Sequence, residues 1–353
     1  MAIRIAINGF GRIGRQTAKA LFEKYEKNEI NVEDIELVAV NDLTDAKTLG
    51  HLLKYDSVYG IMENKIAIKD KSANPVFEGE VAIDDMSFGV LNEEEPLKLP
   101  WKKLGIDLVI ESTGRFLDRE SAGLHLKAGA KKVIVTAPCK GSGVETFVMG
   151  VNMDKYSDGN DVISNASCTT NSIAPVMKVM QEHFGIEKAM MTTTHAFTAD
   201  QVLVDGPHRD LRRARSASIN IIPTTTGAAI AAAKTLPELE GKFDGMSIRV
   251  PVPVGSISDI TMVLKREATP EEISQIFIEE CDKPGWRGIL TYTKDPVVSS
   301  DIIGNPHSAI VDLNLTQVVG KNLVKVCAWY DNEWGYSHRL IEQALYIGEQ
   351  IKK

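Results

Sequence analysis

The chain has 353 residues, with 40 lysines and arginines against 48 aspartates and glutamates, so its formal net charge is −8. This length predicts about two domains, and 43% hydrophobic with 25% charged residues is typical of a globular protein. The acidic balance argues against a nucleic-acid or anionic-membrane partner, and no apolar run approaches the ~20 residues that span a bilayer. Four cysteines without CxxC or Cys/His spacing predict no metal site and no disulfide framework, which suits a cytoplasmic enzyme.

The first forty residues have the pattern of a dinucleotide-binding unit. An apolar strand at 3–7 runs into the turn N-G-F-G-R-I-G at 8–14, a helical stretch follows, and a second strand at 35–40 ends near Asp42. Glycines let such a turn approach a pyrophosphate, and the helix N-terminus favours that anion. Asp42 can accept hydrogen bonds from the adenosine ribose hydroxyls and would repel a 2′-phosphate, which favours NAD over NADP. The candidate cofactor-binding residues here are Gly9, Gly11, Arg12, Ile13, Gly14 and Asp42.

Further strands predict how this unit continues. Asp42 comes 28 residues after Gly14 instead of about 20, so we expect the polar segment 23–34 to lengthen the helix end or the loop. Strands at 107–111 and 132–135, with a helix at 119–128 between them, predict a parallel sheet covered on both faces. Thr136 directly follows the second of these strands, where open α/β sheets bind ligands.

A cysteine at a predicted helix start is the main candidate for chemistry. The polar run S-N-A-S-C-T-T-N-S at 164–172 leads into a helix that Gly185 closes, while Pro175 predicts a kink or a late start. At a helix N-terminus, free N–H groups and the dipole would lower the pKa of the Cys168 thiol. A histidine is the usual base for such a thiol, and the residues alone do not separate His195, which ends a strand at 190–194, from His208.

Three segments together resemble the glyceraldehyde-3-phosphate dehydrogenase family: N-G-F-G-R-I-G-R at 8–15, S-N-A-S-C-T-T-N at 164–171 and W-Y-D-N-E-W-G-Y at 329–336. The resemblance covers essentially the whole chain. It implies NAD-dependent oxidation of glyceraldehyde 3-phosphate with inorganic phosphate to 1,3-bisphosphoglycerate in a homotetramer. It also implies that Cys168 is the nucleophile, that His195 is its base, and that the reaction passes through a hemithioacetal and a thioester on Cys168.

The resemblance further implies a fold and a set of binding residues. A Rossmann-type parallel domain at 1–166, completed by a C-terminal helix at 333–353, would accompany an α+β catalytic domain with a mixed or antiparallel sheet at 167–332. Thr198 and Arg249 match the family's positions for the substrate phosphate, and Asn332 matches the residue for the nicotinamide carboxamide. The positions for inorganic phosphate are matched by Ser167, Thr169, Thr226 and Gly227, with Arg213 near the attacking phosphate.

Two departures from the family pattern bear on the cofactor. Glu94 stands where the family commonly has an arginine near the adenine, which predicts weaker NAD binding, and Gly206-Pro207 stands where NAD-specific relatives often have Leu-Pro. The nearest alternative function is that of erythrose-4-phosphate dehydrogenase, which would hydrolyse its thioester. Thr198, Thr226 and Gly227 favour the phosphorylating enzyme over it. From another class, a non-catalytic NAD-binding or redox sensor would need only the cofactor half.

Overall fold

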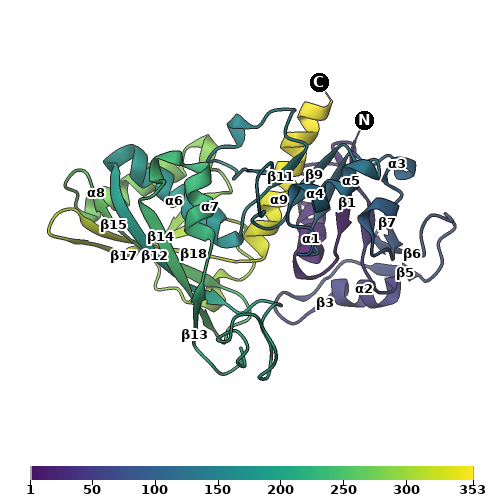
Figure 1. Ribbon diagram of the computed structural model, residues 1–353, viewed down its shortest axis with the longest axis horizontal. Helices are drawn as coiled ribbons and strands as arrows, with labels where there is room; N and C mark the ends of the chain where they lie inside the picture. Colours follow the sequence, from purple (N-terminus) through teal and green to yellow (C-terminus); the bar gives the residue numbers. More distant parts are fainter. Residues whose placement is uncertain (1, 353) are drawn as a thin grey trace. The chain divides into compact units, whose positions relative to one another are not determined.

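The computed structural model describes residues 2–352, which fall into two compact units (Figure 1). The first unit contains residues 2–147, 156–166 and 337–352, and the second contains 148–155 and 167–336. Relative to the predicted domain ranges, the segments 148–155 and 333–336 belong to the second unit. Among the described residues, no helix is long and apolar enough to cross a membrane.

A nine-stranded, mostly parallel sheet forms the centre of the first unit in the described part of the chain. Strand β1 pairs in parallel with β2 on one side and with β8 on the other, so successive connections leave β1 in opposite directions. Such a reversal opens a crevice at the carboxyl ends of the strands, where ligands bind. In sheet order the strands are β10 (Glu145–Thr146), β11 (Val162–Ser164), β9 (Lys132–Val135), β8 (Leu108–Glu111), β1 (Ile3–Asn8), β2 (Ile35–Asn41), β7 (Met86–Leu91), β6 (Gly79–Ile83) and β5 (Ile66–Lys69).

The helices of the first unit settle two expectations. Helix α1 ends at Glu26, and the loop 27–34 before β2 accounts for the long spacing to Asp42. The single helix predicted at 119–128 is wrong, because the segment breaks into two short helices at Gly123, a residue type that weakens helices. The elements are α1 (Arg12–Glu26), α2 (Ala46–Lys54), α3 (Trp101–Leu104), α4 (Arg119–Ala122), α5 (Leu124–Lys127), most of α9 (Trp334–Ile351), and a hairpin of β3 (Tyr55–Asp56) with β4 (Gly60–Ile61).

The second unit has a seven-stranded mixed sheet with α6, α7 and α8 packed against it (Figure 1). Most neighbours are antiparallel, while β12–β14 and β16–β17 are parallel, so the predicted pairing of a Rossmann-type and a mixed-sheet domain is confirmed. In sheet order the strands are β13 (Ile222–Thr225), β14 (Phe243–Val250), β12 (Ile186–Ala196), β15 (Ser256–Leu264), β18 (Leu323–Tyr330), β17 (Ala309–Val319) and β16 (Leu290–Thr293). The helices are α6 (Cys168–Phe184), α7 (Ala228–Thr235) and α8 (Pro270–Cys281).

Helix α6 begins at Cys168, so the late start suggested by Pro175 is wrong. Ser167 caps the helix by accepting a hydrogen bond from the backbone N–H of Thr170. Pro175 removes one backbone donor from the helix interior, but the apolar side chains around it are fully buried and hold the helix together. Gly185, at φ 67°, ends the helix as predicted. The helix therefore starts at the thiol.

Short 3₁₀ segments complete the described elements, at Pro96–Lys98, Met153–Lys155, Pro237–Leu239, Pro284–Trp286 and Ser299–Ile302.

Candidate active site

An open pocket of about 220 Å³ lies at the carboxyl ends of β1, β2, β7 and β8 in the first unit. We call it the cofactor pocket; its lining is Asn8, Gly9, Gly11, Asn41, Asp42, Leu43, Glu93, Glu94, Thr113, Arg115 and Phe116. Three of the predicted cofactor residues, Gly9, Gly11 and Asp42, therefore lie together. The other five stand outside this lining: Arg12, Ile13, Gly14, Thr136 and Asn332.

The three glycines of the turn serve different purposes. A Cβ on Gly9, whose φ is +93°, would lie 2.6 Å from the backbone nitrogen of Thr113, and a Cβ on Gly14 would lie 2.2 Å from the carbonyl oxygen of Gly9. These two glycines allow close backbone packing. Gly11 instead lines the pocket at the start of α1, and a Cβ there would meet nothing within 4 Å. This open space beside a helix N-terminus fits a pyrophosphate.

Asp42 is fixed at the edge of the cofactor pocket by backbone donors. Its Oδ2 accepts a hydrogen bond from the N–H of Phe10 and its Oδ1 accepts one from the N–H of Leu43, each at 2.7 Å. Each carboxylate oxygen keeps a further lone pair that can accept a hydroxyl proton. The charge and the free acceptors fit the unphosphorylated ribose of NAD.

A buried polar network, which sequence reasoning missed, supports the pocket from behind. Trp101 Nε1–H donates to Nδ1 of His125 at 3.0 Å, so the imidazole proton lies on Nε2, which faces Glu111 Oε2 at 3.0 Å. The amide of Asn8 donates to the same carboxylate at 2.6 Å, and Asn41 donates to Asn8 at 2.7 Å. A signal was present in the sequence, since Asn8, Asn41 and Glu111 are each the polar last residue of an apolar strand.

At the rim of the pocket, Glu94 forms an exposed ion pair with Arg115 at 2.9 Å. Glu94 is the residue that departs from the family pattern. Its carboxylate engages a cation that also lines the cofactor pocket, so the pair reduces the positive charge available at this rim.

In the second unit, the candidate nucleophile and base lie against each other. Cys168 is the first residue of α6, His195 lies near the end of β12, and Sγ is 3.4 Å from Nε2. His208, the alternative that the residues left open, instead accepts the backbone N–H of Asp210 at 2.9 Å and lies 4.0 Å from Asp200. Strand β12, which follows α6 in the chain, ends beside the start of α6 and so brings His195 to the thiol.

The surroundings of His195 leave Nε2 as an acceptor. Nδ1 lies 2.6 Å from the carbonyl oxygen of Ala196 and 2.9 Å from Nη1 of Arg249, which also donates to that oxygen at 3.1 Å. The shorter contact, to an oxygen that can only accept, favours the proton on Nδ1. Burial and the charge of Arg249 lower the pKa of His195 to about 3. The imidazole is therefore neutral near pH 7, with a lone pair directed at the thiol.

The thiol itself differs from the expectation. Burial raises the pKa of Cys168 above its usual value, although the charge of Arg249 and the N–H of Thr169 oppose this. The expected lowering by the helix N-terminus is thus outweighed by desolvation. Cys168 needs a proton acceptor at hand to react as a thiolate, and Nε2 of His195 is within reach.

Tyr330 lies next to both groups and was missed in the sequence. Its hydroxyl contacts Oγ1 of Thr169 at 3.0 Å and Oγ1 of Thr193 at 2.8 Å, and its ring meets that of His195 edge-on. Burial raises the pKa of Tyr330 to about 12, so it stays protonated. Tyr330 lies in the family segment at 329–336, but its contact could not be predicted, because Thr169 is 161 residues away. The predicted phosphate ligand Thr169 is engaged with this tyrosine.

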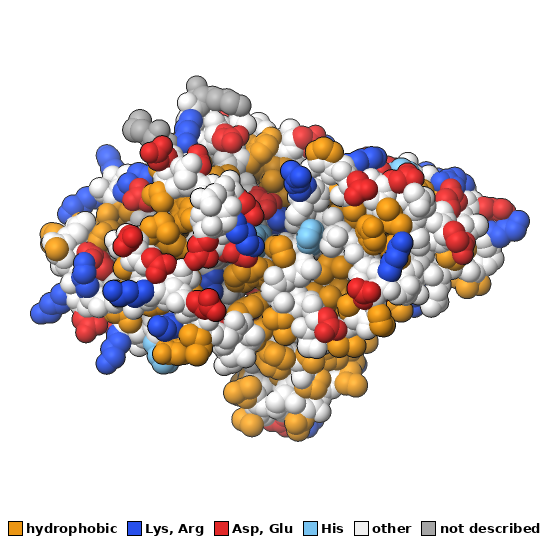
Figure 2. All heavy atoms as spheres, turned by 180° about the vertical axis from the view of Figure 1, so that it is seen from behind, with side chains coloured by type: hydrophobic (Ala, Val, Ile, Leu, Met, Phe, Trp, Pro, Cys, Tyr) orange, Lys and Arg blue, Asp and Glu red, His pale blue; other side chains and the backbone are white. Residues whose placement is uncertain are grey.

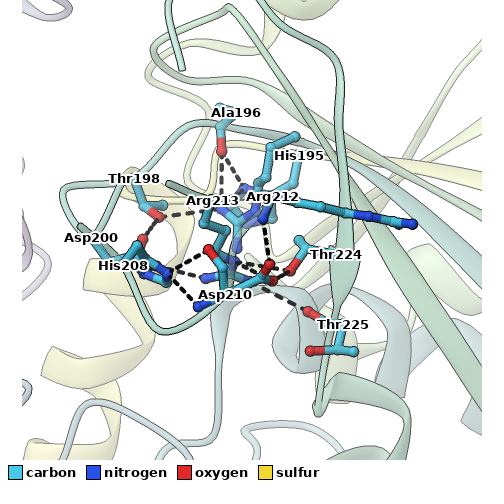
Figure 3. A network of polar contacts seen from close by, with 11 residues as sticks. His195, Ala196, Thr198, Asp200, His208, Asp210, Arg212, Arg213, Thr224 and Thr225 are labelled. Atoms are coloured by element: carbon cyan, nitrogen blue, oxygen red, sulfur yellow. Dashed lines mark hydrogen bonds and ion pairs between the residues drawn. The ribbon is translucent and has the colours of Figure 1, made fainter. Parts of the chain in front are cut away.

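A second polar cluster lies beside His195 (Figure 3). Arg249 donates to Oγ1 of Thr198 at 3.3 Å, and the Thr198 hydroxyl donates to Oδ1 of Asp200. Arg213 donates to Oδ2 of Asp200 at 2.6 Å and to Oγ1 of Thr224 at 3.0 Å. We call these five residues the Asp200 cluster. It unites three predicted phosphate ligands, Thr198, Arg213 and Arg249, with an acid that no local sequence signal marked.

The remaining predicted phosphate ligands surround two helix starts. Oγ1 of Thr226 accepts the N–H of Ala228 at 3.2 Å, and Gly227, the exposed N-cap of α7, has open space at its Cβ position. The Thr170 hydroxyl donates to the carbonyl of Ala228 at 3.5 Å, which places the starts of α6 and α7 side by side. Two helix N-termini at one place form a suitable anion site.

Asn332, the predicted carboxamide ligand, is held in one orientation. Its Oδ1 accepts hydrogen bonds from the N–H of Gly255 at 3.2 Å and from the hydroxyl of Ser256 at 3.0 Å. The NH₂ end of its amide consequently points away from these two residues.

Two protein-family models match the chain. The model "Glyceraldehyde 3-phosphate dehydrogenase, NAD binding domain" matches residues 3–119, and the corresponding C-terminal domain model matches 167–332. The chain is 50% identical to glyceraldehyde-3-phosphate dehydrogenase of Streptomyces coelicolor, over 99% of this chain and 100% of that protein. It is 49% identical to the Geobacillus stearothermophilus enzyme, over 99% of both, and 48% identical to that of Mycolicibacterium smegmatis, over 99% of this chain and 100% of the other.

Proposed function

The chain belongs to the glyceraldehyde-3-phosphate dehydrogenase family, and we propose that it oxidises glyceraldehyde 3-phosphate with NAD and inorganic phosphate to 1,3-bisphosphoglycerate, a reaction of glycolysis. The observation that carries the mechanism is the 3.4 Å approach of Cys168 Sγ to the neutral Nε2 of His195.

Cys168 adds to the aldehyde carbon while its proton passes to Nε2, and Nε2 returns that proton to the carbonyl oxygen, which gives a hemithioacetal. His195 then holds the hydroxyl proton of that intermediate as the carbon loses hydride, which leaves a thioester on Cys168. NAD, when bound, supplies the acceptor for the hydride. Phosphate attacks the thioester carbon, the thiolate leaves, and Cys168 regains a proton.

The predicted phosphate ligands support two anion subsites in this proposal. Thr198 and Arg249, which are bonded to each other, would hold the phosphate of the substrate. Ser167, Thr226 and Gly227, at the adjoining starts of α6 and α7, would hold inorganic phosphate. Arg213, a member of the Asp200 cluster, would bind the attacking phosphate. Thr169 can join them by donating its hydroxyl proton to the phosphate while its oxygen accepts from Tyr330.

The residues of the cofactor pocket fit NAD. The open face of Gly11 would admit the pyrophosphate and Asp42 the adenosine ribose. In the second unit, the oriented amide of Asn332 would bind the carboxamide through its NH₂. The 2′-phosphate of NADP would meet the Asp42 carboxylate.

We propose a cytoplasmic homotetramer as the working form. Support comes from the segment 203–221, where large apolar side chains are strongly exposed and hydrophobic spheres gather on the lower projection in Figure 2. These residues are Leu203 (72% exposed), Val204, Leu211, Ile219 and Ile221. Apolar surface of this extent is typical of an interface between subunits.

A single-turnover experiment tests the proposed reaction. Mixed with glyceraldehyde 3-phosphate and NAD without phosphate, the protein should release about one NADH per site and carry an acyl group on the Cys168 peptide in mass spectra. Added phosphate should remove that group. Steady NADH formation without phosphate would indicate hydrolysis, as in erythrose-4-phosphate dehydrogenase, and neither NADH nor adduct would indicate a sensor.

A further inference from the structure

The carboxylate of Asp200 occupies one donor of each proposed phosphate subsite. Its Oδ1 accepts the hydroxyl proton of Thr198, and its Oδ2 accepts an N–H of Arg213 at 2.6 Å. A carboxylate and a phosphate each present two oxygens to such donors, and they compete for the same positions. Figure 3 shows Asp200 between these two residues.

The partners of Arg213 indicate which of its contacts can be exchanged. Its Nε donates to Thr224 at 3.0 Å and its Nη2 donates to the carbonyl of Thr225 at 3.3 Å, both on β13. Of these three hydrogen bonds, only the one from Nη1 is made to an ionised side chain, and Asp200 is 45% exposed. Asp200 can therefore swing into solvent while β13 keeps the guanidinium in place.

The ionised side chains of the Asp200 cluster and of the neighbouring Asp210 together carry no net charge. Arg213 and Arg249 carry two positive charges, while Asp200 and Asp210 carry two negative ones, with Asp210 3.9 Å from Nε of Arg213. Although burial raises the pKa of Asp200, the hydrogen bond from Thr198 and the charge of Arg213 hold it below its usual value. Asp200 is thus ionised at neutral pH, where it reduces the attraction for any incoming anion.

We propose that Asp200 is an internal competitor of phosphate: it holds Thr198 and Arg213 in the free protein, yields them to substrate phosphate groups, and so weakens anion binding enough for a bisphosphate product to leave. This inference rests on the proposed function for the identity of the anion. It assigns to Asp200 control of affinity, with no part in the thiol chemistry.

The test compares Asp200→Asn with Asp205→Asn. Asp205 lies in the same loop, is exposed, and pairs with Arg215 at 2.8 Å, so its substitution makes the same change in net charge away from the cluster. Affinity for inorganic phosphate is measured by titration calorimetry on the full-length, NAD-saturated protein at constant ionic strength. Thermal unfolding of each variant checks that it is folded.

Asp200→Asn should bind phosphate about fivefold more tightly, and 1,3-bisphosphoglycerate should inhibit it at about fivefold lower concentration. Asp205→Asn should match the unsubstituted protein. Unchanged affinity in Asp200→Asn would overturn the proposal, and weaker binding would show instead that Asp200 positions Arg213 for the anion.

These outcomes are separable from the proposed function. If NADH formation does not require phosphate but Asp200→Asn still binds phosphate more tightly, the reaction assignment fails and the role of Asp200 stands. If turnover requires phosphate and the variant binds it no more tightly, only the role of Asp200 fails.

Discussion

The cofactor pocket and the thiol site are built in different ways. The pocket uses the ends of parallel strands, backbone N–H groups and a glycine turn contained in seven consecutive residues. The thiol site gathers Cys168, His195, Arg249 and Tyr330 from one helix and three strands between residues 168 and 330. A local motif therefore defines the first site, and the pairing order of a sheet defines the second.

The strongest test of this separation is Cys168→Ser. The hydroxyl is a far weaker nucleophile, so NADH formation should fall at least about a thousandfold, while NAD affinity measured by calorimetry stays within about twofold. His195→Asn should lower kcat by about a hundredfold or more through loss of the base. A large loss of NAD affinity in Cys168→Ser would show that the two sites are not independent.

Thiol reactivity should differ sharply within the chain. Burial raises the pKa of Cys281 to about 12 and that of Cys327 to about 11, so their thiolates are scarce at neutral pH and increase as the pH rises. Cys168 has Nε2 of His195 at 3.4 Å. It should therefore react with iodoacetamide at pH 7.5 at least about a hundredfold faster than Cys281 and Cys327 do. Peptide mapping measures this, and His195→Asn should remove the advantage.

Asp42→Asn affects the other site. Loss of a charged acceptor for the ribose should raise the KM for NAD about tenfold and reduce the preference for NAD over NADP. The reactivity of Cys168 with iodoacetamide should stay unchanged. Asp45→Asn is the matched control: it removes the same charge three residues away, and asparagine caps α2 as well as aspartate does. Equal kinetics for both variants would contradict the role of Asp42.

Trp101→Phe tests the network behind the pocket. It leaves the buried Nδ1 of His125 without its donor, which should lower the free energy of unfolding by about 1–3 kcal/mol and raise the KM for NAD about twofold. Trp286→Phe breaks a similar bond to buried Glu280 in the second unit, at 3.1 Å. This control should destabilise the protein without changing the KM for NAD. An identical KM in both variants would show that the network stabilises the fold but does not affect cofactor binding.

The smallest expected effect is that of Glu94→Gln. Freeing Arg115 from its exposed ion pair should lower the KM for NAD by about twofold, since such pairs are weak. Glu95→Gln, which frees Lys98 from a comparable exposed pair at 2.9 Å, should leave the KM unchanged. A higher KM in Glu94→Gln would mean that Glu94 itself contacts the cofactor.

The difference between the two sites also explains what the sequence could predict. The strand, glycine turn, helix and acid at 3–42 were predictable because each step depends on near neighbours and on backbone geometry. The start of α6 at Cys168 was predictable only in part, because Pro175 argues locally against a helix that tertiary packing then stabilises.

Contacts across the second sheet could not be predicted from residues alone. His195 and His208 are equivalent by local pattern, and only the pairing of β12 with β14 and β15 brings His195 near Arg249 and the thiol. The net pKa of Cys168 depends on burial by such distant elements. The acid Asp200 and the buried Tyr330 acquire their partners in the same way.

In the proposed reaction, the acyl group formed on Cys168 is passed to phosphate. We would measure NADH formation from glyceraldehyde 3-phosphate and NAD, with enzyme far below substrate, in the presence and absence of inorganic phosphate. We expect steady turnover with phosphate and no more than about one NADH per site without it. Equal steady rates in both conditions would contradict it, because water would then resolve the thioester.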